Sequence, residues 1–286
     1  MRYVGLIPHL DKEAAIEAAR ILLGLLAKYD LEIFLPQEAA NLVPGPVHYC
    51  AYDRLTRDMD LLFVLGGDGT LLQTARRIAG SGIPILGINV GHLGFLTELE
   101  PSELAQGVEL LFNGAYHVEE RMMLKAEVYR EEKLLGSYLA LNDAVVTRGP
   151  VARIINLETR VNEQLIGNFA ADGIIVSTPT GSTAYNLSAG GPVVHPLAKN
   201  LIITPICPHT LSVTRSVLTL PEEEIRIRVQ AVHTDTVLTV DGRLETFLKS
   251  DDVIHISQAE EKTRLVRVLG RGFYEVLRNR LAHPEV

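Results

Sequence analysis

Hydrophobic and polar positions in the first third of the chain follow an alternation of short apolar runs and helix-spaced apolar positions. The run Asp60–Leu65 (DLLFVL) is almost continuously apolar, which is typical of a strand buried on both faces. A second such run follows at Ile83–Ile88, and between the two runs apolar residues recur at helical spacing over Thr70–Ala79. This order of strand, helix and strand predicts a parallel sheet in an α/β domain.

The same rhythm begins at the N-terminus. Strands are predicted at Tyr3–Ile7 and Glu32–Leu35, with a helix between them for which Asp11 is the expected N-cap. The apolar face of that helix is formed by Ala15, Ala18, Leu22, Leu25 and Tyr29. Another helix is predicted over Ser102–Phe112.

From about Arg121 to Leu269 the pattern changes to many short strands separated by turn signals such as Asp241-Gly242. The segment Glu224–Val229 alternates apolar and charged positions, as a strand with one buried face does. An all-β second domain is therefore expected over residues 119–270. The tail Phe273–Leu281 returns to helical spacing, and we expect residues 271–286 to pack back on the first domain, residues 1–118.

Composition narrows the class of protein. A chain of 286 residues with 47% hydrophobic and 22% charged residues has the make-up of an ordinary globular protein of about two domains. The net charge of −8 argues against broad nucleic-acid binding, which needs a basic surface. Two cysteines, no signal-peptide pattern and no apolar run of membrane-spanning length lead us to expect a soluble, cytoplasmic protein without a membrane partner.

The segment Gly66–Thr70 (GGDGT) lies between the buried strand and the helix that follows it. Glycines at such a turn allow the backbone to approach a ligand closely, and the N-terminus of the helix favours phosphate. Asp68 is the unusual member, because a carboxylate repels phosphate unless it takes a proton from an attacking hydroxyl or holds a divalent cation. The alternative is a tight turn in which the aspartate caps the helix.

Several familiar motifs are absent. The chain has no G-x-x-x-x-G-K-[ST] sequence, and the segment Gly270–Glu275 lacks the third glycine of a dinucleotide-binding fingerprint. No G-x-S-x-G elbow supports a hydrolase, and the nine histidines show no metal-ligand spacing. We therefore expect no dedicated metal site, and any metal would be a Mg²⁺ ion that accompanies a substrate.

A second polar cluster occurs in the β-rich part. Asn142-Asp143 follows an apolar strand and could bind sugar hydroxyls or an adenine edge, although such a pair also suits a turn. The segment Ala171–Pro192 runs from a buried-type strand into the sequence TPTGSTAY, which begins at Thr178. Hydroxyls and backbone N–H groups at a strand-to-helix junction can form a cradle for a nucleotide, and the alternative is an ordinary polar loop.

Taken together, these segments resemble the NAD kinase family. The matching pieces are Gly66–Thr70, Gly91–Leu96 (GHLGFL), Asn142-Asp143, Asp172-Gly173, Thr178–Tyr185 and Gly190–Pro192, in the same order and with similar spacing from about residue 60 to 245. GGDGT alone also resembles the turn of lipid kinases and phosphofructokinases, whereas TPTGSTAY in the same chain is highly specific. The resemblance implies an N-terminal α/β domain, a β-sandwich-like C-terminal domain, and a terminal segment that returns to the first. It further implies NAD bound between the domains and a homo-oligomer, dimer or tetramer.

The resemblance also implies an activity, the transfer of the γ-phosphoryl group of ATP or polyphosphate to the adenosine-ribose 2′-hydroxyl of NAD, with Mg²⁺ or another divalent cation. Asp68 matches the family's proposed general base. The donor phosphates are expected to contact Gly66, Gly67, Gly69, Thr70 and Arg76. NAD is expected to contact Asp68, Gly69, Phe95, Asn142, Asp143, Arg153, Ala170, Asp172, Thr180, Thr183, Ala184, Tyr185, Asn186, Leu187, Ser188 and Arg243. The arginines could equally be solvated surface charges.

One departure and two alternatives accompany this interpretation. Many bacterial members carry a basic residue where Ala170 stands here, which bears on the choice between NAD and NADH. A lipid or sphingosine kinase could use the same glycine turn, but it would need an apolar substrate groove in place of TPTGSTAY. A nucleotide-sensing protein without activity would have little use for Asp68.

Overall fold

The computed structural model describes residues 1–91, 94–149, 154–209, 215–230 and 236–282. The chain forms two compact units, one comprising Met1–Glu120 and the C-terminal segment from Thr263, the other Arg121–Lys262. The boundaries follow Glu120 and Lys262, two and eight residues from the expected positions 118 and 270. Strands β6 (His117–Arg130) and β17 (Val253–Arg267) both run through a boundary, so no loop or composition change marks it in the sequence.

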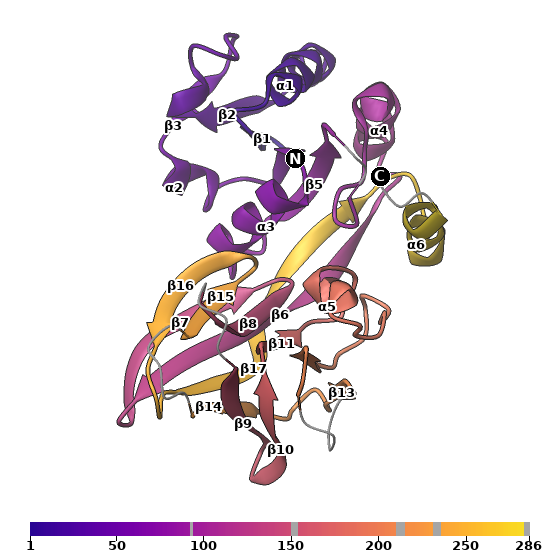
Figure 1. Ribbon diagram of the computed structural model, residues 1–286. Helices are drawn as coiled ribbons and strands as arrows, with labels where there is room; N and C mark the ends of the chain where they lie inside the picture. The colour runs from indigo at the N-terminus through magenta and orange to yellow at the C-terminus, as the bar shows by residue number, and fades with distance from the viewer. Residues whose placement is uncertain (92–93, 150–153, 210–214, 231–235, 283–286) are drawn as a thin grey trace. The chain divides into compact units, whose positions relative to one another are not determined.

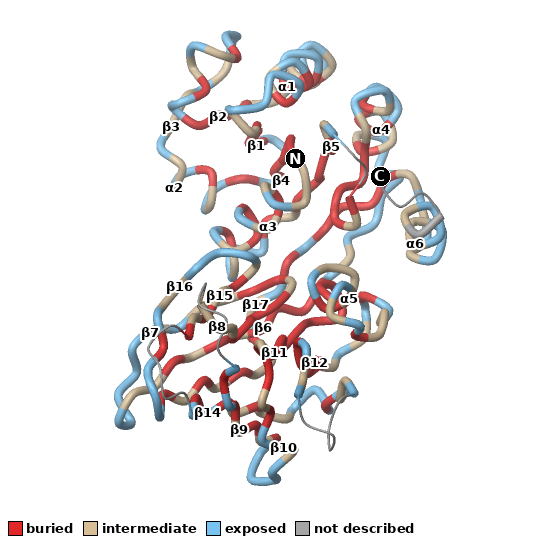
Figure 2. Tube along the Cα trace, in the orientation of Figure 1, coloured by how far each residue is buried: buried red, intermediate tan, exposed pale blue. Residues whose placement is uncertain are grey.

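The first unit contains the predicted parallel sheet. Its strands are β1 (Tyr3–Pro8), β2 (Glu32–Pro36), β3 (His48–Cys50), β4 (Leu61–Gly66) and β5 (Pro84–Asn89). Their order is β3-β2-β1-β4-β5, and Arg264 and Leu265 of β17 add a parallel pairing beside β5. Every residue of β4 is buried, as the apolar run predicted, and Figure 2 shows β4 and β5 in the colour of buried residues.

Helices complete the first unit (Figure 1). They are α1 (Glu13–Leu26), the 3-10 turn Gln37–Ala39, α2 (Tyr52–Leu55), α3 (Asp68–Arg77), the 3-10 turn Pro101–Glu103, α4 (Leu104–Phe112) and α6 (Phe273–Ala282). The prediction of Asp11 as the cap of α1 was wrong. The N-cap is Lys12, whose carbonyl accepts the N–H groups of Ala15 and Ile16 and whose side chain makes no cap hydrogen bond. Tyr29 lies beyond the end of α1 and stacks on Phe112 with ring centroids 3.8 Å apart.

The second unit is β-rich, as expected. One antiparallel sheet has the order β13-β12-β11-β8-β15-β16, and a second has the order β10-β9-β14 followed by the first part of β17. The strands are β6, β7 (Lys133–Ala140), β8 (Asp143–Arg148), β9 (Ile155–Val161), β10 (Gln164–Ala171), β11 (Gly173–Ser177), β12 (Ile202–Ile206), β13 (Val217–Leu218), β14 (Ile225–Val229), β15 (Thr236–Val240), β16 (Arg243–Leu248) and β17.

The two sheets of this unit share one apolar core, which makes the unit sandwich-like. Val146 and Ile174 of the first sheet belong to the same buried cluster as Leu157 and Ile227 of the second. The alternation predicted for β14 is confirmed, because Ile225, Ile227 and Val229 are buried while the arginines between them are not. The polar segments of the unit begin at the ends of strands that pack in this core.

Candidate active site

The glycine turn of the first unit joins β4 to α3. β4 ends at Gly66, Gly67 is the N-cap in an extended conformation, and α3 begins at Asp68. A Cβ atom on Gly66 would lie 2.3 Å from Oγ1 of Thr70, so only glycine fits there. Cβ atoms on Gly67 and Gly69 would meet nothing within 4 Å. These two glycines therefore leave the backbone of the turn open to a ligand at the positive end of the α3 dipole.

Asp68 is oriented by the segment that follows β5. Its Oδ2 accepts the N–H of Phe95 at 2.9 Å, and its Oδ1 accepts the N–H of Leu96 at 3.3 Å. Gly94 lies against the same carboxylate, since a Cβ atom there would come 1.9 Å from Oδ1. Gly94, Phe95 and Leu96 of the GHLGFL segment thus fix the carboxylate of the GGDGT turn.

A buried ion pair contacts the backbone of this segment. Glu98 and Arg267 are 4% and 8% exposed, and their side chains approach to 3.2 Å. The Glu98 carboxylate also accepts the N–H groups of Val268 and Leu269, while Arg267 donates to the carbonyl of Leu96 at 3.3 Å. Because Leu96 holds Asp68 through its N–H, Arg267 is linked to the Asp68 carboxylate through a single residue.

The terminal helix adds a contact to the same segment. The guanidinium of Arg280, on α6, lies 5.6 Å from the ring centroid of Phe95. Arg271 donates to the carbonyl of Glu98 and pairs with Glu103. The return of the C-terminal segment to the first unit therefore contributes directly to the surroundings of Asp68.

In the second unit, Asn142 and Asp143 are fixed by Asp241. The Asp241 carboxylate accepts the N–H groups of Leu141, Asn142 and Asp143 at 3.0, 2.8 and 3.2 Å. Asp143 is 4% exposed, and burial together with the nearby charge of Asp241 raises its pKa to about 7. Oδ1 of Asn142 is buried and accepts no hydrogen bond from the described residues, so it offers an unused acceptor.

The TPTGSTAY segment packs directly on this pair. The Thr178 hydroxyl donates to the carbonyl of Leu141 at 2.6 Å, and the Thr178 N–H donates to the carbonyl of Asn142 at 2.8 Å. A Cβ atom on Gly181 would lie 2.3 Å from the carbonyl oxygen of Asn142, which explains a glycine at this position. Thr180, whose hydroxyl accepts a hydrogen bond from Arg121 at 3.4 Å, is buried beside them.

Asn186 lies in the interior of this segment. The 3-10 turn Thr180–Thr183 leads into the short helix α5 (Tyr185–Ser188), in which Asn186 is fully buried. Its amide donates to the carbonyls of Ser182 and Pro192 and accepts the hydroxyl of Thr204 at 2.7 Å. Gly191 lies close against it. The side chain of Asn186 is thus occupied by protein partners and holds the segment in shape.

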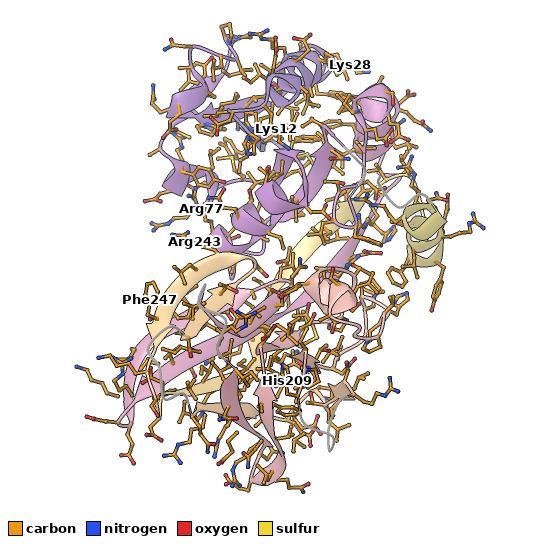
Figure 3. The ribbon with its side chains drawn as sticks, in the orientation of Figure 1. Lys12, Lys28, Arg77, His209, Arg243 and Phe247 are labelled. Carbon is orange, nitrogen blue, oxygen red and sulfur yellow. The ribbon has the colours of Figure 1, made fainter. Side chains whose placement is uncertain are left out.

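The other expected NAD contacts have different surroundings. Within the TPTGSTAY segment and α5, Thr183, Ala184 and Leu187 are half-buried, whereas Tyr185 and Ser188 are exposed. Asp172 pairs with Arg148 at 2.7 Å, and this bond lowers the pKa of the Asp172 carboxyl. The carbonyl of Ala170 accepts the N–H of His209. Arg243 begins β16 and is exposed (Figure 3), Arg76 is half-buried on α3, and Arg153 lies outside the described residues.

Sequence reasoning missed several residues that shape these two clusters. Asp241 was recognised only as part of a turn, and Arg148, Glu98 and Arg267 were not singled out. Their partners lie far away in the sequence, about 100 residues for Asp241 and 169 for the pair Arg267–Glu98. A single charged residue carries no local signal of such a partner. Gly94 was identified only through the resemblance of GHLGFL to the family.

Two kinds of feature are absent from the described part of the chain. No group of three histidine, cysteine, aspartate or glutamate side chains that could hold a metal occurs there. None of the helices formed by these residues has the length and apolar character needed to cross a membrane.

Both halves of the chain match known proteins. Residues 4–116 match the profile described as the ATP-NAD kinase N-terminal domain, and residues 141–268 match that of the ATP-NAD kinase C-terminal domain. The chain is 40% identical over 281 residues to an NAD kinase of Caldanaerobacter subterraneus subsp. tengcongensis, an alignment that covers 98% of this chain and 99% of the relative. It is 43% identical over 281 residues to an NAD kinase of Moorella thermoacetica, with 98% of this chain and 89% of the relative covered.

Two solved structures share the fold. Yeast NADH kinase complexed with NADH superposes with a TM-score of 0.89 at 24% identity, covering 100% of this chain and 89% of that one. An NAD kinase from Archaeoglobus fulgidus in complex with ATP superposes with a TM-score of 0.76 at 23% identity, covering 100% of both chains. At this level of identity the likeness establishes the fold.

Proposed function

The chain belongs to the ATP-NAD kinase family and is an enzyme that phosphorylates NAD to NADP, and from this premise we propose that Asp68 is its general base. The observation that carries the proposal is the position of the Asp68 carboxylate, which two backbone N–H groups hold at the mouth of an open glycine turn. The donor is ATP. A bond forms between the 2′-oxygen of the adenosine ribose and the γ-phosphorus, while the bond from that phosphorus to the bridging oxygen of ADP breaks. The proton of the hydroxyl passes to Asp68.

The remaining chain residues act by positioning. Gly66, Gly67, Gly69 and Thr70 surround the donor phosphates, and the α3 dipole offsets part of their charge. For NAD we assign contacts to the Asn142-Asp143 pair, whose unused acceptor suits a hydroxyl or amino group, and to the exposed part of the Thr180–Ser188 segment. Phosphoryl transfer depends mainly on such positioning and on charge neutralisation.

A divalent cation fits the chemistry of this turn. Mg²⁺ is commonly held by one or two carboxylates together with the phosphates of the substrate. The described residues offer no dedicated cluster of ligands, but each oxygen of Asp68 accepts a single backbone hydrogen bond from them and retains a further lone pair. When bound, the ion would neutralise charge on the donor phosphates. Asp68 and the hydroxyl of Thr70 are the residues that would face it.

The experiment that tests Asp68 is the substitution Asp68→Asn. Turnover should fall by roughly 10²- to 10⁴-fold, the range of general acid–base groups, while the affinity for NAD stays within about twofold. Asp60→Asn is the matched control, because Asp60 also accepts two backbone N–H groups, those of Arg2 and Tyr3, at the opposite end of β4. Turnover of Asp68→Asn close to that of the wild type would remove the residue from this role.

A lipid kinase is the less favoured function, because the second unit matches the NAD kinase C-terminal profile as well.

We also propose that the protein is cytoplasmic, with sparse cysteines as support, and that it is a homo-oligomer. β16 is the last strand of its sheet among the described residues, and it exposes Leu244 by 50% and Phe247 by 65%. Phe247 is labelled in Figure 3. An apolar edge of this kind favours pairing with another copy. Sedimentation velocity of Phe247→Lys should reveal a smaller species than the wild type forms.

A further inference from the structure

A cavity of about 690 Å³ lies in the first unit beside the glycine turn. Its walls come from the residues that follow β1 and β2, from α2, and from α3. In parallel sheets ligands bind at the carboxyl ends of the strands, which is where this cavity opens. A volume in this range is typical of sites for drug-sized ligands, so the cavity can hold a nucleoside.

One face of α3 connects the turn to the cavity. Thr70, Gln73, Thr74 and Arg77 all line the cavity, and their spacing places them along a single side of the helix. Thr70 is the last residue of the GGDGT turn, whereas Arg77 ends α3 about two turns later (Figure 3). A ligand whose phosphates lie at the turn would therefore extend along this face into the cavity.

The chemistry of the cavity changes along its length. Beyond Thr70 the lining carries three carboxylates, those of Asp11, Glu38 and Asp53, and a single arginine, Arg77. This balance repels phosphate but suits ribose hydroxyls and an exocyclic amine, which donate hydrogen bonds to carboxylates. Nδ1 of His9 is buried in the same lining and has no partner among the described residues, so it leaves a polar atom for a ligand to satisfy.

A flat surface is also present. The guanidinium of Arg77 lies 4.3 Å from the ring centroid of Tyr52, and the Tyr52 hydroxyl lies 3.4 Å from Oγ1 of Thr74. The ring is thereby held between α2 and α3 with a cation on one face. Purine bases stack well on aromatic rings and on guanidinium planes.

We propose that this cavity binds the nucleoside of the phosphate donor, with the base against the Tyr52–Arg77 pair and the ribose among the carboxylates. The inference rests on the proposed function, because it takes the glycine turn as the site of the donor phosphates. Contacts with the base and the ribose favour a nucleoside triphosphate over polyphosphate as the phosphate donor. They also give the first unit a specificity that the phosphate turn alone does not have.

The test compares donors with and without a nucleoside on the full chain. The affinities for ATP and for inorganic tripolyphosphate, each with Mg²⁺, are measured by calorimetry for the wild type, Tyr52→Ala and Arg77→Ala. The KM for NAD is measured with ATP as donor. The matched control is Lys28→Ala, which removes a cation lying 5.2 Å from the ring centroid of Tyr29, outside the cavity (Figure 3). Arg77 is exposed at the end of α3, so its variant retains the fold even if Tyr52→Ala loosens α2.

We expect both cavity variants to lower the affinity for ATP by about 5- to 100-fold, the range for the loss of a base stack. The affinity for tripolyphosphate and the KM for NAD should each change by less than twofold. An equal loss of affinity for ATP and for tripolyphosphate would overturn the proposal, since the cavity residues would then contact phosphates. Unchanged ATP affinity, or a raised KM for NAD alone, would overturn it as well. Failure of the proposed function is a separate outcome, because the wild type would then form no NADP from NAD and ATP.

Discussion

Gly94 lies directly against the carboxylate of Asp68, so closely that a Cβ atom on Gly94 would come 1.9 Å from Oδ1. The two residues are 26 positions apart in the chain and leave different strands of the same sheet. The N–H groups of the two residues after Gly94 hold the same carboxylate. The absence of a side chain at Gly94 is therefore a condition for the position of the proposed base.

The substitution Gly94→Ala should displace the Asp68 carboxylate and lower turnover by on the order of 10²-fold, since a misplacement of about 1 Å has effects of this size. The affinity for NAD should change little, because the residues assigned to NAD in the second unit are untouched. The control is Gly24→Ala, where the added methyl group meets nothing within 4 Å. Steady-state kinetics of the three proteins checks this. Equal turnover of Gly94→Ala and the wild type would mean that the contact does not matter for catalysis.

Much of the fold follows from local patterns. The sequence of β4 contains six residues without a polar side chain, and the sequence of β14 alternates apolar residues with arginine. These patterns work because burial on one or both faces acts on each residue separately. The boundaries between the units were harder to place, because β6 and β17 continue through them as regular strands.

The site was predictable to the extent that it uses short motifs. The glycine turn was recognised by its position between strand and helix, since backbone geometry and the helix dipole act over a few residues. The residues that hold these motifs in place were not predictable from the sequence. Arg267 pairs with Glu98, and Asp241 accepts the N–H of Leu141, only after the chain has folded. For Asn186 the sequence indicated a contact with NAD, a role that remains a prediction, while the structure adds a structural role for its side chain.

Arg267 should act as a positioning residue for Asp68. Arg267→Ala leaves Glu98 buried without its main cation, which should reduce the free energy of unfolding by about 3 to 5 kcal/mol. Turnover should fall because the carbonyl of Leu96 loses its anchor, whereas the KM for NAD stays nearly constant. Arg267→Lys should restore part of both the stability and the turnover.

The matched control for Arg267 is Arg264→Ala, on the same strand. Arg264 is about half exposed and pairs with Glu120, so the loss should be at most about 1 kcal/mol. Thermal unfolding and kinetics on the same samples separate the two effects. If Arg267→Ala lost stability yet kept full turnover at a temperature where it is folded, Arg267 would be structural only.

Substitutions of Asn186 and Ser188 should distinguish a residue that maintains the structure of α5 from one that contacts NAD. Asn186→Ala removes three internal hydrogen bonds from a fully buried site and should cost about 2 to 4 kcal/mol of stability, together with weaker binding of NAD. Ser188→Ala, at an exposed position, should weaken NAD binding without a measurable loss of stability. Titration with NAD and thermal melts test both. Loss of stability in Ser188→Ala, or unaltered NAD affinity in Asn186→Ala, would contradict these assignments.

Asp143 should make the stability of the protein fall as pH rises from about 4 to 7. Burial and the charge of Asp241 raise the pKa of this carboxyl from 3.8 to about 7 in the folded chain, so the folded state retains a proton that the unfolded state releases in this window. Below the window both states are protonated and Asp143 has no effect. Above it, ionisation of the buried carboxyl disfavours the folded state by on the order of 4 kcal/mol.

The variant Asp143→Asn keeps the shape of the side chain but cannot ionise, so it should be more stable than the wild type at pH 8 and nearly equal to it at pH 3.5. Carboxyls with a lowered pKa, such as Asp60 and Asp172, change stability in the opposite direction, but they are common to both proteins and cancel in the difference. Chemical unfolding at intervals across this pH range measures that difference. A constant difference would show that the pKa of Asp143 is the same in the folded and unfolded states, and burial would then not raise it.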